Sequence, residues 1–408
     1  MFIALLIATT AAFILTSCGA QPTGGGGSAN VPRIRKGPYL LYTGSSESMT
    51  IMWQTSTTPT TSEIYWGTSI SYSFNAITTE NSASSEYHQF SYTISGLTPD
   101  SKYFYKISMN IGTYESYFWT PPNPSATNLI FYAYGDSRSN PNMNNTIQRG
   151  ILDDIIANNI HGTFVIHVGD FAAYGMSESY LDSEFFYRNH SETLSFESIV
   201  PVMYCVGNHD CYTKNADYRY EAPAGRLLRK YWPYTFAPTT ERSYYSFEYG
   251  PVFVCILDQY TKTGYSTPED AEQYSWATQE IESSTKSWKI AAMHEPAWAA
   301  RVNPYPGDNH GNHPEIQEYY HPVFRDNTVE VVLEGHNHFY SRCETEEVTY
   351  LTVGGGGAPL HIPELSAENL ITAESTYQYT KFSVSSNIMT VETFNSAGTR
   401  IDSFEVTP

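Results

Sequence analysis

The chain has few basic residues. Its 408 residues include 22 Lys and Arg against 42 Asp and Glu, so the formal net charge is −20. Nucleic acids and anionic membrane surfaces are bound through basic patches, so neither is expected as a surface partner of this chain. Charged residues reach only 16%, whereas aromatic residues reach 15%. Disordered chains combine high charge with few aromatic residues, so the bulk of this chain is expected to fold.

Cysteine is also scarce, with five residues in the chain. Four lie beyond the N-terminal segment, and none has the spacing of a zinc finger. Cys205 and Cys255 stand in apolar runs and are expected to be buried. Cys211 and Cys343 each follow a histidine-containing motif, and a disulfide between them is one alternative that export of the chain would permit.

A single apolar run approaches the length of a membrane span, at residues 1–17. It ends in Leu15-Thr16-Ser17-Cys18, which resembles a bacterial lipobox. We therefore expect residues 1–18 to be a lipoprotein signal peptide and residues 19–32 a flexible linker. The protein would be exported and lipid-anchored at Cys18 to the bacterial cell envelope, on its periplasmic or cell-surface face. Secretory signals normally begin with Lys or Arg, which this run lacks, so a short transmembrane anchor is the alternative.

Residues 33–122 have the pattern of an all-β domain. Short runs rich in β-branched and aromatic residues alternate with Pro, Gly, Ser and Asn clusters, which is typical of a β-sandwich. Strands are expected at residues 48–55, 62–68, 86–94, 102–109 and 114–120. Leu97-Thr98-Pro99-Asp100, followed by Tyr103, resembles the tyrosine corner of fibronectin type III domains.

Residues 127–408 have a different pattern, in which apolar runs of strand length end in polar motifs. The five runs are 129–134, 163–168, 200–206, 288–293 and 329–333, and they lead into Gly135-Asp136, Gly169-Asp170, Gly207-Asn208-His209-Asp210, His294 and Gly335-His336-Asn337-His338. Ligands of α/β proteins bind where such strands end. Helices are expected at residues 144–160 and 314–327, and antiparallel strands from Tyr377 onward.

The polar motifs contain the donor types of a divalent metal site. Imidazole suits Zn, Fe or Mn, and carboxylate suits the harder ions. A carboxylate can bridge two ions, and such a pair clamps the attacking and leaving oxygens of phosphoryl hydrolysis. One Gly-Asp dipeptide means little, but five motifs in this order within one domain indicate a binuclear metal centre.

These motifs resemble those of the calcineurin-like metallophosphoesterase superfamily. The preceding sandwich makes the chain similar to its purple acid phosphatase branch, over residues 33–408. Further shared features are Lys36-Gly37-Pro38-Tyr39, residues 335–340 and the glycine run 354–357 with Ala358 and Pro359. The resemblance implies a fibronectin type III-like sandwich followed by an α/β domain, in which two packed mixed sheets are flanked by helices.

The resemblance also implies a role for each motif residue. Metal one would be held by Asp136 and His338, metal two by Asn208, His294 and His336, and Asp170 would bridge the two ions, which would be divalent or trivalent Fe, Zn or Mn. His209 matches the histidine beside the leaving group, and Asp210 could orient it.

Two positions depart from the pattern of the superfamily. Its first motif is usually Asp-x-His, where this chain has Arg138. Purple acid phosphatases instead supply a tyrosine three residues after the bridging aspartate, where this chain has Ala173. Water could fill the place of that ligand, or Tyr174 could reach it. Arg138 stays protonated and could either bind a phosphate through two donors or pair with a carboxylate.

Other histidines and glycines have simpler interpretations. His167 stands inside an apolar strand and is expected in the core. His310 and His313 are expected at the rim of the site or on the surface. The glycine run 354–357 lacks the Lys-Ser or Lys-Thr of a nucleotide-binding loop and is expected to form a tight turn near the site.

The predicted function is therefore hydrolysis of a small phosphorylated substrate, most simply a phosphomonoester, by a metal-bound hydroxide. A phosphodiesterase or nucleotidase would use the same ligands. A surface binding protein with a weakened metal site is a further alternative, because metal one lacks an obvious ligand.

Overall fold

The computed structural model describes residues 34–83, 87–187, 196–217, 226–238, 243–260, 271–300 and 310–408. The expected signal peptide, the lipobox with Cys18 and the linker lie outside these residues. Within the described parts of the chain, no helix is both long enough and apolar enough to cross a membrane.

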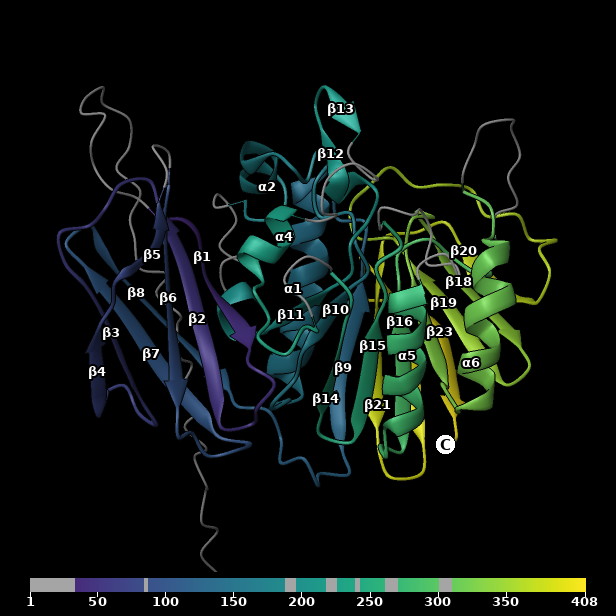
Figure 1. Ribbon diagram of the computed structural model, residues 1–408, viewed down its shortest axis with the longest axis horizontal. Coiled ribbons are helices and arrows are strands. Elements are labelled where there is room, and N and C mark those ends of the chain that lie inside the picture. Colours follow the sequence, from purple (N-terminus) through teal and green to yellow (C-terminus); the bar gives the residue numbers. More distant parts are fainter. Residues whose placement is uncertain are drawn as a thin grey trace, which may run out of the picture.

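The N-terminal domain is a sandwich of two four-stranded antiparallel sheets, with the strand orders β1-β2-β6-β5 and β4-β3-β7-β8 (Figure 1). Its strands are β1 (Ile34–Tyr42), β2 (Ser48–Thr55), β3 (Ser62–Gly67), β4 (Phe74–Ile77), β5 (Glu80–Ala83), β6 (His88–Ser95), β7 (Lys102–Met109) and β8 (Gly112–Trp119). The two sheets enclose a core that includes Trp53, Tyr105 and Phe118. The hydroxyl of Tyr103 accepts a hydrogen bond from the Thr98 backbone N–H at 3.1 Å, as a tyrosine corner requires.

The second domain contains two mixed sheets, which confirms the predicted fold class. The first sheet consists of β9 (Leu129–Tyr134), β10 (Val165–His167), β11 (Val202–Tyr204), β21 (Gln378–Val384), β22 (Met389–Asn395) and β23 (Arg400–Val406). The second sheet consists of β14 (Tyr245–Tyr249), β15 (Val252–Ile256), β16 (Trp288–Ala292), β17 (Val331–Glu334), β18 (Tyr340–Thr345), β19 (Val348–Val353) and β20 (Leu370–Glu374). The parallel strands β9, β10 and β11 in one sheet and β16 and β17 in the other carry the five predicted motifs at their ends. In the second sheet, β15 and β19 pair in parallel with β16 and β17.

Helices and short elements complete this domain (Figure 1). They are α1 (Pro141–Ala157), α2 (Glu178–Ser183), the 3₁₀ turn η1 (His209–Cys211), the hairpin of β12 (Tyr212–Thr213) and β13 (Ala216–Asp217), α4 (Arg226–Tyr231), α5 (Ala271–Ser283), the π-helical turn η3 (Ile316–Tyr320) and α6 (His321–Asp326). Helix α1 begins where the Asn140 side chain accepts a hydrogen bond from the Met143 backbone N–H, and Pro141 fits its first turn.

Alternation along β15 explains why the second sheet has two buried faces. Val252, Val254 and Ile256 belong to the core shared with the first sheet, whereas Phe253 and Cys255 belong to the core beneath α5 and α6. Successive side chains of a strand point to opposite faces, so a strand that is covered on both faces is apolar throughout. The same arrangement accounts for the continuous apolar runs in the sequence.

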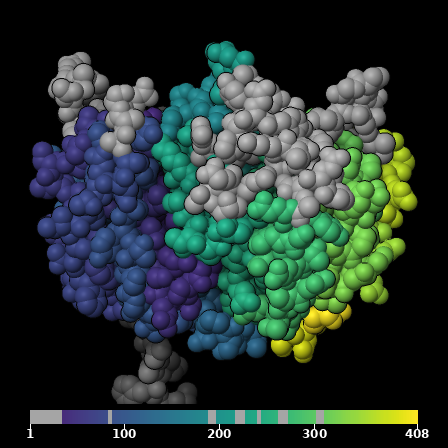
Figure 2. Space-filling model, viewed as in Figure 1, coloured from purple at the N-terminus to yellow at the C-terminus, as the bar shows by residue number. Residues whose placement is uncertain are grey.

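Strand β1 attaches the N-terminal domain to the second domain. Figure 2 shows the two domains in direct contact, with the purple and blue residues against the teal ones. The Tyr39 hydroxyl donates to the Tyr231 carbonyl at 2.9 Å, and the Tyr42 hydroxyl donates to that of Glu248 at 2.8 Å. Both tyrosines belong to the core of the second domain, so the two domains share buried apolar surface.

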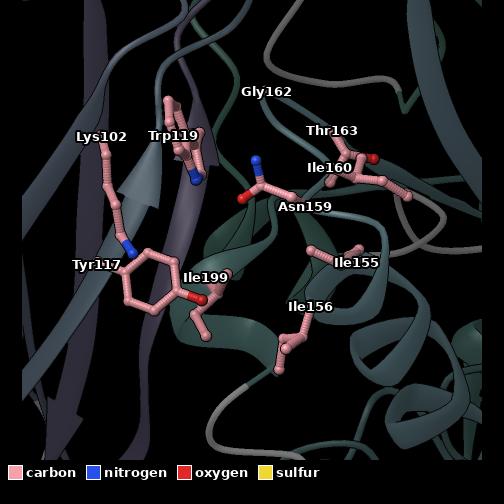
Figure 3. A pocket seen from close by; sticks show the side chains of 10 residues that line it. All are labelled: Lys102, Tyr117, Trp119, Ile155, Ile156, Asn159, Ile160, Gly162, Thr163 and Ile199. Carbon is pink, nitrogen blue, oxygen red and sulfur yellow. The ribbon is translucent and has the colours of Figure 1, made fainter. Parts of the chain in front are cut away.

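A pocket of about 190 Å³ lies at the domain boundary, between β8 and the C-terminal end of α1 (Figure 3). The amino group of Lys102 lies 3.7 Å from the centroid of the Tyr117 ring. Trp119 also lines the pocket, and its ring stacks on His161 at 3.7 Å between centroids. The described residues that line this pocket include none of the predicted site residues.

The disulfide between Cys211 and Cys343, which the sequence left open as one alternative, does not form. Cys205, Cys211, Cys255 and Cys343 are all buried as free thiols. Cys211 packs in the core that contains the first sheet, and Cys343 packs in the core beneath α5 and α6, so the second sheet separates them.

Candidate metal centre

The predicted donor residues gather where the parallel strands of both sheets end. Asp136 follows β9, Asp170 follows β10, Asn208 follows β11, His294 follows β16, and His336 and His338 follow β17. All six side chains are buried, with at most 6% of each residue exposed. Asp136 and His338, 202 positions apart in the sequence, thus lie side by side, because parallel strands bring their carboxyl ends to one edge.

The turns that carry the donors have a strained backbone. Asp136, Asp170 and His336 have φ angles of 55°, 60° and 64°, in the left-handed region that residues with a side chain seldom adopt. Glycines allow the close approach of neighbouring turns. A Cβ atom on Gly207 would lie 2.2 Å from the Asp170 Oδ1 atom, and one on Gly335 would lie 2.6 Å from the Asp136 Oδ2 atom.

One group of donors consists of Asp136, Asp170 and His338. One ligand atom of each lies within 4.8 Å of the others, so a single metal ion can contact all three. The Nε2 atom of His338 lies 3.6 Å from the Asp136 Oδ1 atom. The Asp136 carboxylate also accepts the backbone N–H of His336 at 3.0 Å and 3.1 Å, which fixes its orientation.

A second group consists of Asn208, His294 and His336. The Oδ1 atom of Asn208 lies 3.2 Å from His294 Nε2 and 3.1 Å from His336 Nδ1. The His294 Nε2 atom also lies 3.4 Å from Asp170 Oδ1. Asp170 therefore stands between the two groups, at the place expected for a carboxylate that bridges two ions.

The histidine rings are held in the way that metal ligands usually are. The Nδ1 atom of His294 donates to the Val168 carbonyl at 2.7 Å, and that of His338 donates to the Pro359 carbonyl at 2.7 Å. Each of these bonds orients the ring so that its Nε2 atom is the nitrogen that faces the site.

The electrostatics of the donor residues favour a cation. Burial and the neighbouring Asp170 raise the pKa of Asp136 well above its usual value. Burial opposes ionisation of Asp170 too, but His294, His209 and Arg138 outweigh it and lower its pKa. Burial lowers the pKa of His336 to about 3, so this imidazole is neutral at pH 7. Two facing buried carboxylates beside neutral imidazoles are a set that divalent cations stabilise, so the residues fit a metal centre.

Arg138 lies beside both carboxylate and imidazole ligands. Its Nε atom donates to Asp170 Oδ2 at 3.0 Å, and its Nη2 atom lies 3.3 Å from His338 Nε2. The side chain remains 15% exposed, in contrast to the buried donors around it. Of the two expected roles, pairing with a carboxylate is observed, and the exposed part of the guanidinium is still available to an anion.

The structure places His209 and Asp210 in different roles. The Nδ1 atom of His209 donates to the Ala173 carbonyl at 2.9 Å, which orients the ring. Asp210 accepts the backbone N–H groups of Asp170 and Gly207, each at 2.8 Å, and that of Phe171 at 3.0 Å. The expectation that Asp210 orients His209 is therefore corrected: its carboxylate instead joins the turns after β10 and β11.

The Tyr174 ring packs edge-on against Tyr180, with 4.7 Å between centroids. Ala173 contributes its backbone: its N–H donates to Glu184 Oε2 at 2.8 Å, and its carbonyl binds His209. No motif indicated Glu184, because it follows a short helix without any pattern of site residues.

Two further histidines lie against histidines of the two donor groups. His310 stacks on His336 at 4.4 Å between centroids, and His361 stacks on His338 at 4.0 Å. His310 thus lies at the site, as one of the expected alternatives had it, and His361 was not predicted because it stands alone in a loop. His313 is not a surface residue: it is buried, and its Nε2 atom lies 2.6 Å from Glu295 Oε2.

His167 and the glycine run 354–357 support the site from behind. His167 is fully buried, and its Nε2 atom lies 3.0 Å from the Ser137 hydroxyl, as expected of a core histidine. The glycine run passes directly behind the first donor group. A Cβ atom on Gly354 would lie 2.8 Å from Asp136 Oδ2, and the Ala358 N–H donates to the Asp136 carbonyl at 2.8 Å.

Comparison with known families agrees with this arrangement. Residues 142–340 match the family model described as calcineurin-like phosphoesterase, and residues 36–127 match the one described as the N-terminal domain of purple acid phosphatase. The chain joins a calcineurin-like phosphoesterase domain to a purple acid phosphatase N-terminal domain. The resemblance seen in the motifs is thereby confirmed.

Similar proteins carry related names. A purple acid phosphatase of Glycine max is 27% identical over 285 residues, which cover 66% of this chain and 56% of that protein. A phosphoenolpyruvate phosphatase of Allium cepa is 25% identical over 363 residues, covering 83% of this chain and 68% of that protein. The match thus spans little more than half the length of the soybean protein.

A solved structure supports the fold. The purple acid phosphatase PPD1 from yellow lupin (Lupinus luteus) seeds superposes with a TM-score of 0.74 at 18% identity. The superposition covers 93% of this chain and 74% of the lupin chain, so it includes both domains.

Proposed function

We propose that this chain is a metal-dependent hydrolase of phosphate esters and that phosphomonoesters are its preferred substrates. The observation that carries this proposal is the meeting of two donor groups at one edge, with Asp170 between them. The family assignment of the second domain supports the same class of reaction.

Each donor group would hold one metal ion. Asp136 and His338 would bind the first ion, and Asn208, His294 and His336 would bind the second, with Asp170 shared. The mixture of imidazole and carboxylate suits Fe, Zn or Mn. When bound, such a pair lowers the pKa of a water molecule and offsets negative charge on the phosphate.

Two side chains of the protein would act on the substrate itself. Arg138 is partly exposed and permanently charged, so its remaining N–H groups can bind phosphate oxygens. The Nδ1 atom of His209 is occupied by the Ala173 carbonyl, which leaves Nε2 as the nitrogen that would hold a proton for the leaving oxygen.

The arrangement favours a monoester over a diester. A phosphomonoester carries up to two negative charges at neutral pH, whereas a diester carries one. The net charge of the chain is −20, which repels both at long range, so the attraction must come from the site itself. Arg138 and the two bound ions would concentrate positive charge at the site. This charge would strengthen binding of a monoester dianion more than binding of a diester, which carries a single negative charge.

Metal analysis and a substrate panel would test the proposal. The purified protein would be loaded with Fe, Zn or Mn, its metal content measured, and its activity compared on p-nitrophenyl phosphate and bis-p-nitrophenyl phosphate. We expect two ions per chain and faster turnover of the monoester. Preference for the diester would favour a phosphodiesterase, and two bound ions without turnover of either compound would favour a binding protein.

We also propose that the mature protein is exported and anchored through lipid on Cys18. The sequence Leu15-Thr16-Ser17-Cys18 and the glycine-rich residues after it support this proposal. A linker of this composition would separate the catalytic domains from a membrane surface.

A further inference from the structure

Glu184 lies outside every sequence motif, yet its side chain joins the two turns that carry Asp136 and Asp170. Its Oε2 atom accepts the backbone N–H of Ser139 at 2.6 Å and that of Ala173 at 2.8 Å. Ser139 lies three residues after Asp136, and Ala173 lies three residues after Asp170. We propose that Glu184 is a positioning residue for the metal centre, and that Lys36 of the N-terminal domain holds it in place.

The bond to Ser139 supports the placement of Arg138. Ser139 has a φ angle of 69°, a left-handed conformation that needs support from its surroundings. Arg138 directly precedes it, and the Arg138 backbone N–H donates to the Asp170 carbonyl at 3.2 Å. Release of Ser139 would therefore let the Arg138 guanidinium move away from Asp170.

The bond to Ala173 supports the placement of His209. The carbonyl of Ala173 accepts the His209 Nδ1–H, so the position of this one residue sets the direction of the His209 ring. A single carboxylate oxygen thus reaches both side chains that would contact the substrate, Arg138 through Ser139 and His209 through Ala173.

The surroundings of Glu184 strengthen its hydrogen bonds with Ser139 and Ala173. The residue is only 7% exposed, so water competes poorly for its carboxylate. Hydrogen bonds from N–H groups to a carboxylate are stronger than those to a neutral acceptor. Removal of the carboxylate would leave two backbone N–H groups without this acceptor, which is costly wherever water cannot replace it.

Helix α2 connects Glu184 to the N-terminal domain. Glu184 directly follows this helix of six residues, which is too short to be stable without tertiary contacts. Lys36 on β1 supplies such contacts: its amino group pairs with Glu178 at 2.9 Å and with Asp182 at a still shorter distance. Arg35 adds an ion pair with Asp182 at 2.5 Å.

The side chain of Lys36 is fully buried, whereas those of Glu178 and Asp182 are 19% and 26% exposed, so its two ion pairs are partly shielded from solvent. Lys36 is the one of these cations that contacts both carboxylates, since Arg35 pairs with Asp182 and Lys230 pairs with Glu178. A Lys36→Met variant would keep those two outer pairs but lose the contact that ties both carboxylates of α2 to β1. The helix would shift or fray, and Glu184 would move with it.

Variants of Glu184 in the full chain test the first half of this proposal. Metal content is followed by elemental analysis during titration with a chelator, in parallel with KM and kcat for p-nitrophenyl phosphate. We expect Glu184→Ala to weaken retention of the metal that the chelator removes first by about tenfold. Loss of a residue that supports metal ligands without touching the metal usually has an effect of this size. Glu184→Gln keeps a carbonyl acceptor and should restore most of this loss. Equal metal retention in Glu184→Ala and wild type would overturn the positioning role.

A matched pair of lysine variants tests the second half. Lys36→Met removes the contact with α2. Lys286→Met removes a lysine that also lies at the domain boundary but donates to the carbonyls of Pro124 and Gly250, away from α2. We expect Lys36→Met to release metal more readily and Lys286→Met to match wild type in metal release. Equal metal release by Lys36→Met and Lys286→Met would overturn the role of Lys36. This comparison can be made even if Glu184→Ala does not fold.

This inference rests on the proposed metal centre, but the two fail in different ways. If wild type binds no metal, the proposed metal centre is wrong. If wild type binds two ions but hydrolyses neither ester, the proposed hydrolase activity is wrong. If wild type binds and hydrolyses as proposed and the variants release metal at the wild-type rate, the function stands and the inference about Glu184 and Lys36 is wrong.

Discussion

The Nε atom of Arg138 lies 3.0 Å from the Oδ2 atom of Asp170, the carboxylate that both donor groups share. A guanidinium cannot lose its proton at the pH of a cell, so Arg138 always offsets part of the negative charge of the carboxylates at the site. The first motif of the superfamily that the sequence resembles is usually Asp-x-His, with the histidine at the position of Arg138. The site therefore has a fixed organic cation where that motif has an imidazole.

Arg138→Ala should impair substrate binding more than metal binding. Loss of a charged hydrogen bond to phosphate costs about 1.5–3 kcal/mol, which corresponds to a KM about 10-fold to 100-fold higher. Steady-state kinetics and metal analysis would check this. Arg149→Ala is the control, because Arg149 is 60% exposed on α1. An unchanged KM with loss of metal would show that Arg138 serves only as a counter-ion of Asp170.

Asp170→Asn should cost the protein both metals. An amide has one oxygen and no charge, so it cannot replace a carboxylate that lies between two ions. We expect elemental analysis to find little metal in the variant and turnover to fall by several orders of magnitude. Asp153→Asn, which changes an exposed residue of α1, should retain both. Full metal occupancy in Asp170→Asn would contradict the bridging assignment.

The first donor group is predicted to be one protein ligand short, and a substitution should supply that ligand. Ala173→Tyr and Arg138→His each add a donor that related enzymes possess, so either should raise the affinity for the more labile metal. Iron-loaded Ala173→Tyr should also acquire a tyrosinate-to-iron absorption band in the visible. Because Tyr174 packs on Tyr180, Tyr174→Phe should leave the spectrum of the iron-loaded protein unchanged. A band in wild type that Tyr174→Phe removes would show that Tyr174 binds the metal.

Stability at the domain boundary should depend on pH through Glu178. Burial alone would raise the pKa of Glu178, but Lys36, Lys230 and Tyr231 outweigh it and lower the pKa from 4.5 to about 2. A lowered carboxyl pKa stabilises the folded state above pH 4.5, and this contribution disappears as the pH falls from 4.5 to 2. It amounts to less than about 3 kcal/mol, because solvent screens part of it.

Thermal melts of Glu178→Gln would check this dependence. The variant should have a lower Tm than wild type at pH 7, and the difference should shrink toward pH 2.5. Glu282→Gln, on the exposed side of α5, should follow wild type throughout. A difference that stays constant with pH would mean that Glu178 contributes by packing rather than by charge.

Cys18→Ala should abolish lipid attachment. Lipid is transferred to the sulfur of the lipobox cysteine, so the variant should not incorporate labelled fatty acid and should be released in soluble form or remain unprocessed. Metabolic labelling followed by fractionation would show this. Incorporation of label into Cys18→Ala, or none into wild type, would contradict the lipoprotein assignment.

The strands and their motifs could be predicted from the sequence because their signals are local. The apolar run 129–134 coincides with β9, and the expected strands 48–55 and 102–109 coincide with β2 and β7. Strand β1 was missed, since Gly37 and Pro38 interrupt its pattern and pairing with β2 overrides them. Expected helix 314–327 is divided between a π-helical turn and α6.

The support of the site was less predictable, because it depends on contacts between distant segments. Glu184 and His361 stand in segments without a repeated pattern, and only the fold brings them to Ala173 and His338. The prediction that Asp210 orients His209 was wrong for a related reason. Adjacency to His209 in the sequence suggested a contact with its ring, whereas the turn directs the carboxylate to the backbone of the neighbouring turn.

The left-handed backbone at Asp136, Asp170 and His336 sets fold stability against activity. Left-handed conformations cost roughly 1–2 kcal/mol for residues with a side chain and almost nothing for glycine. Glycine at any of the three would relieve that cost and remove a ligand in the same step. A laboratory selection for heat resistance alone could therefore favour glycine at these three positions and remove metal ligands. Thermostable variants of this protein should be screened for activity in parallel.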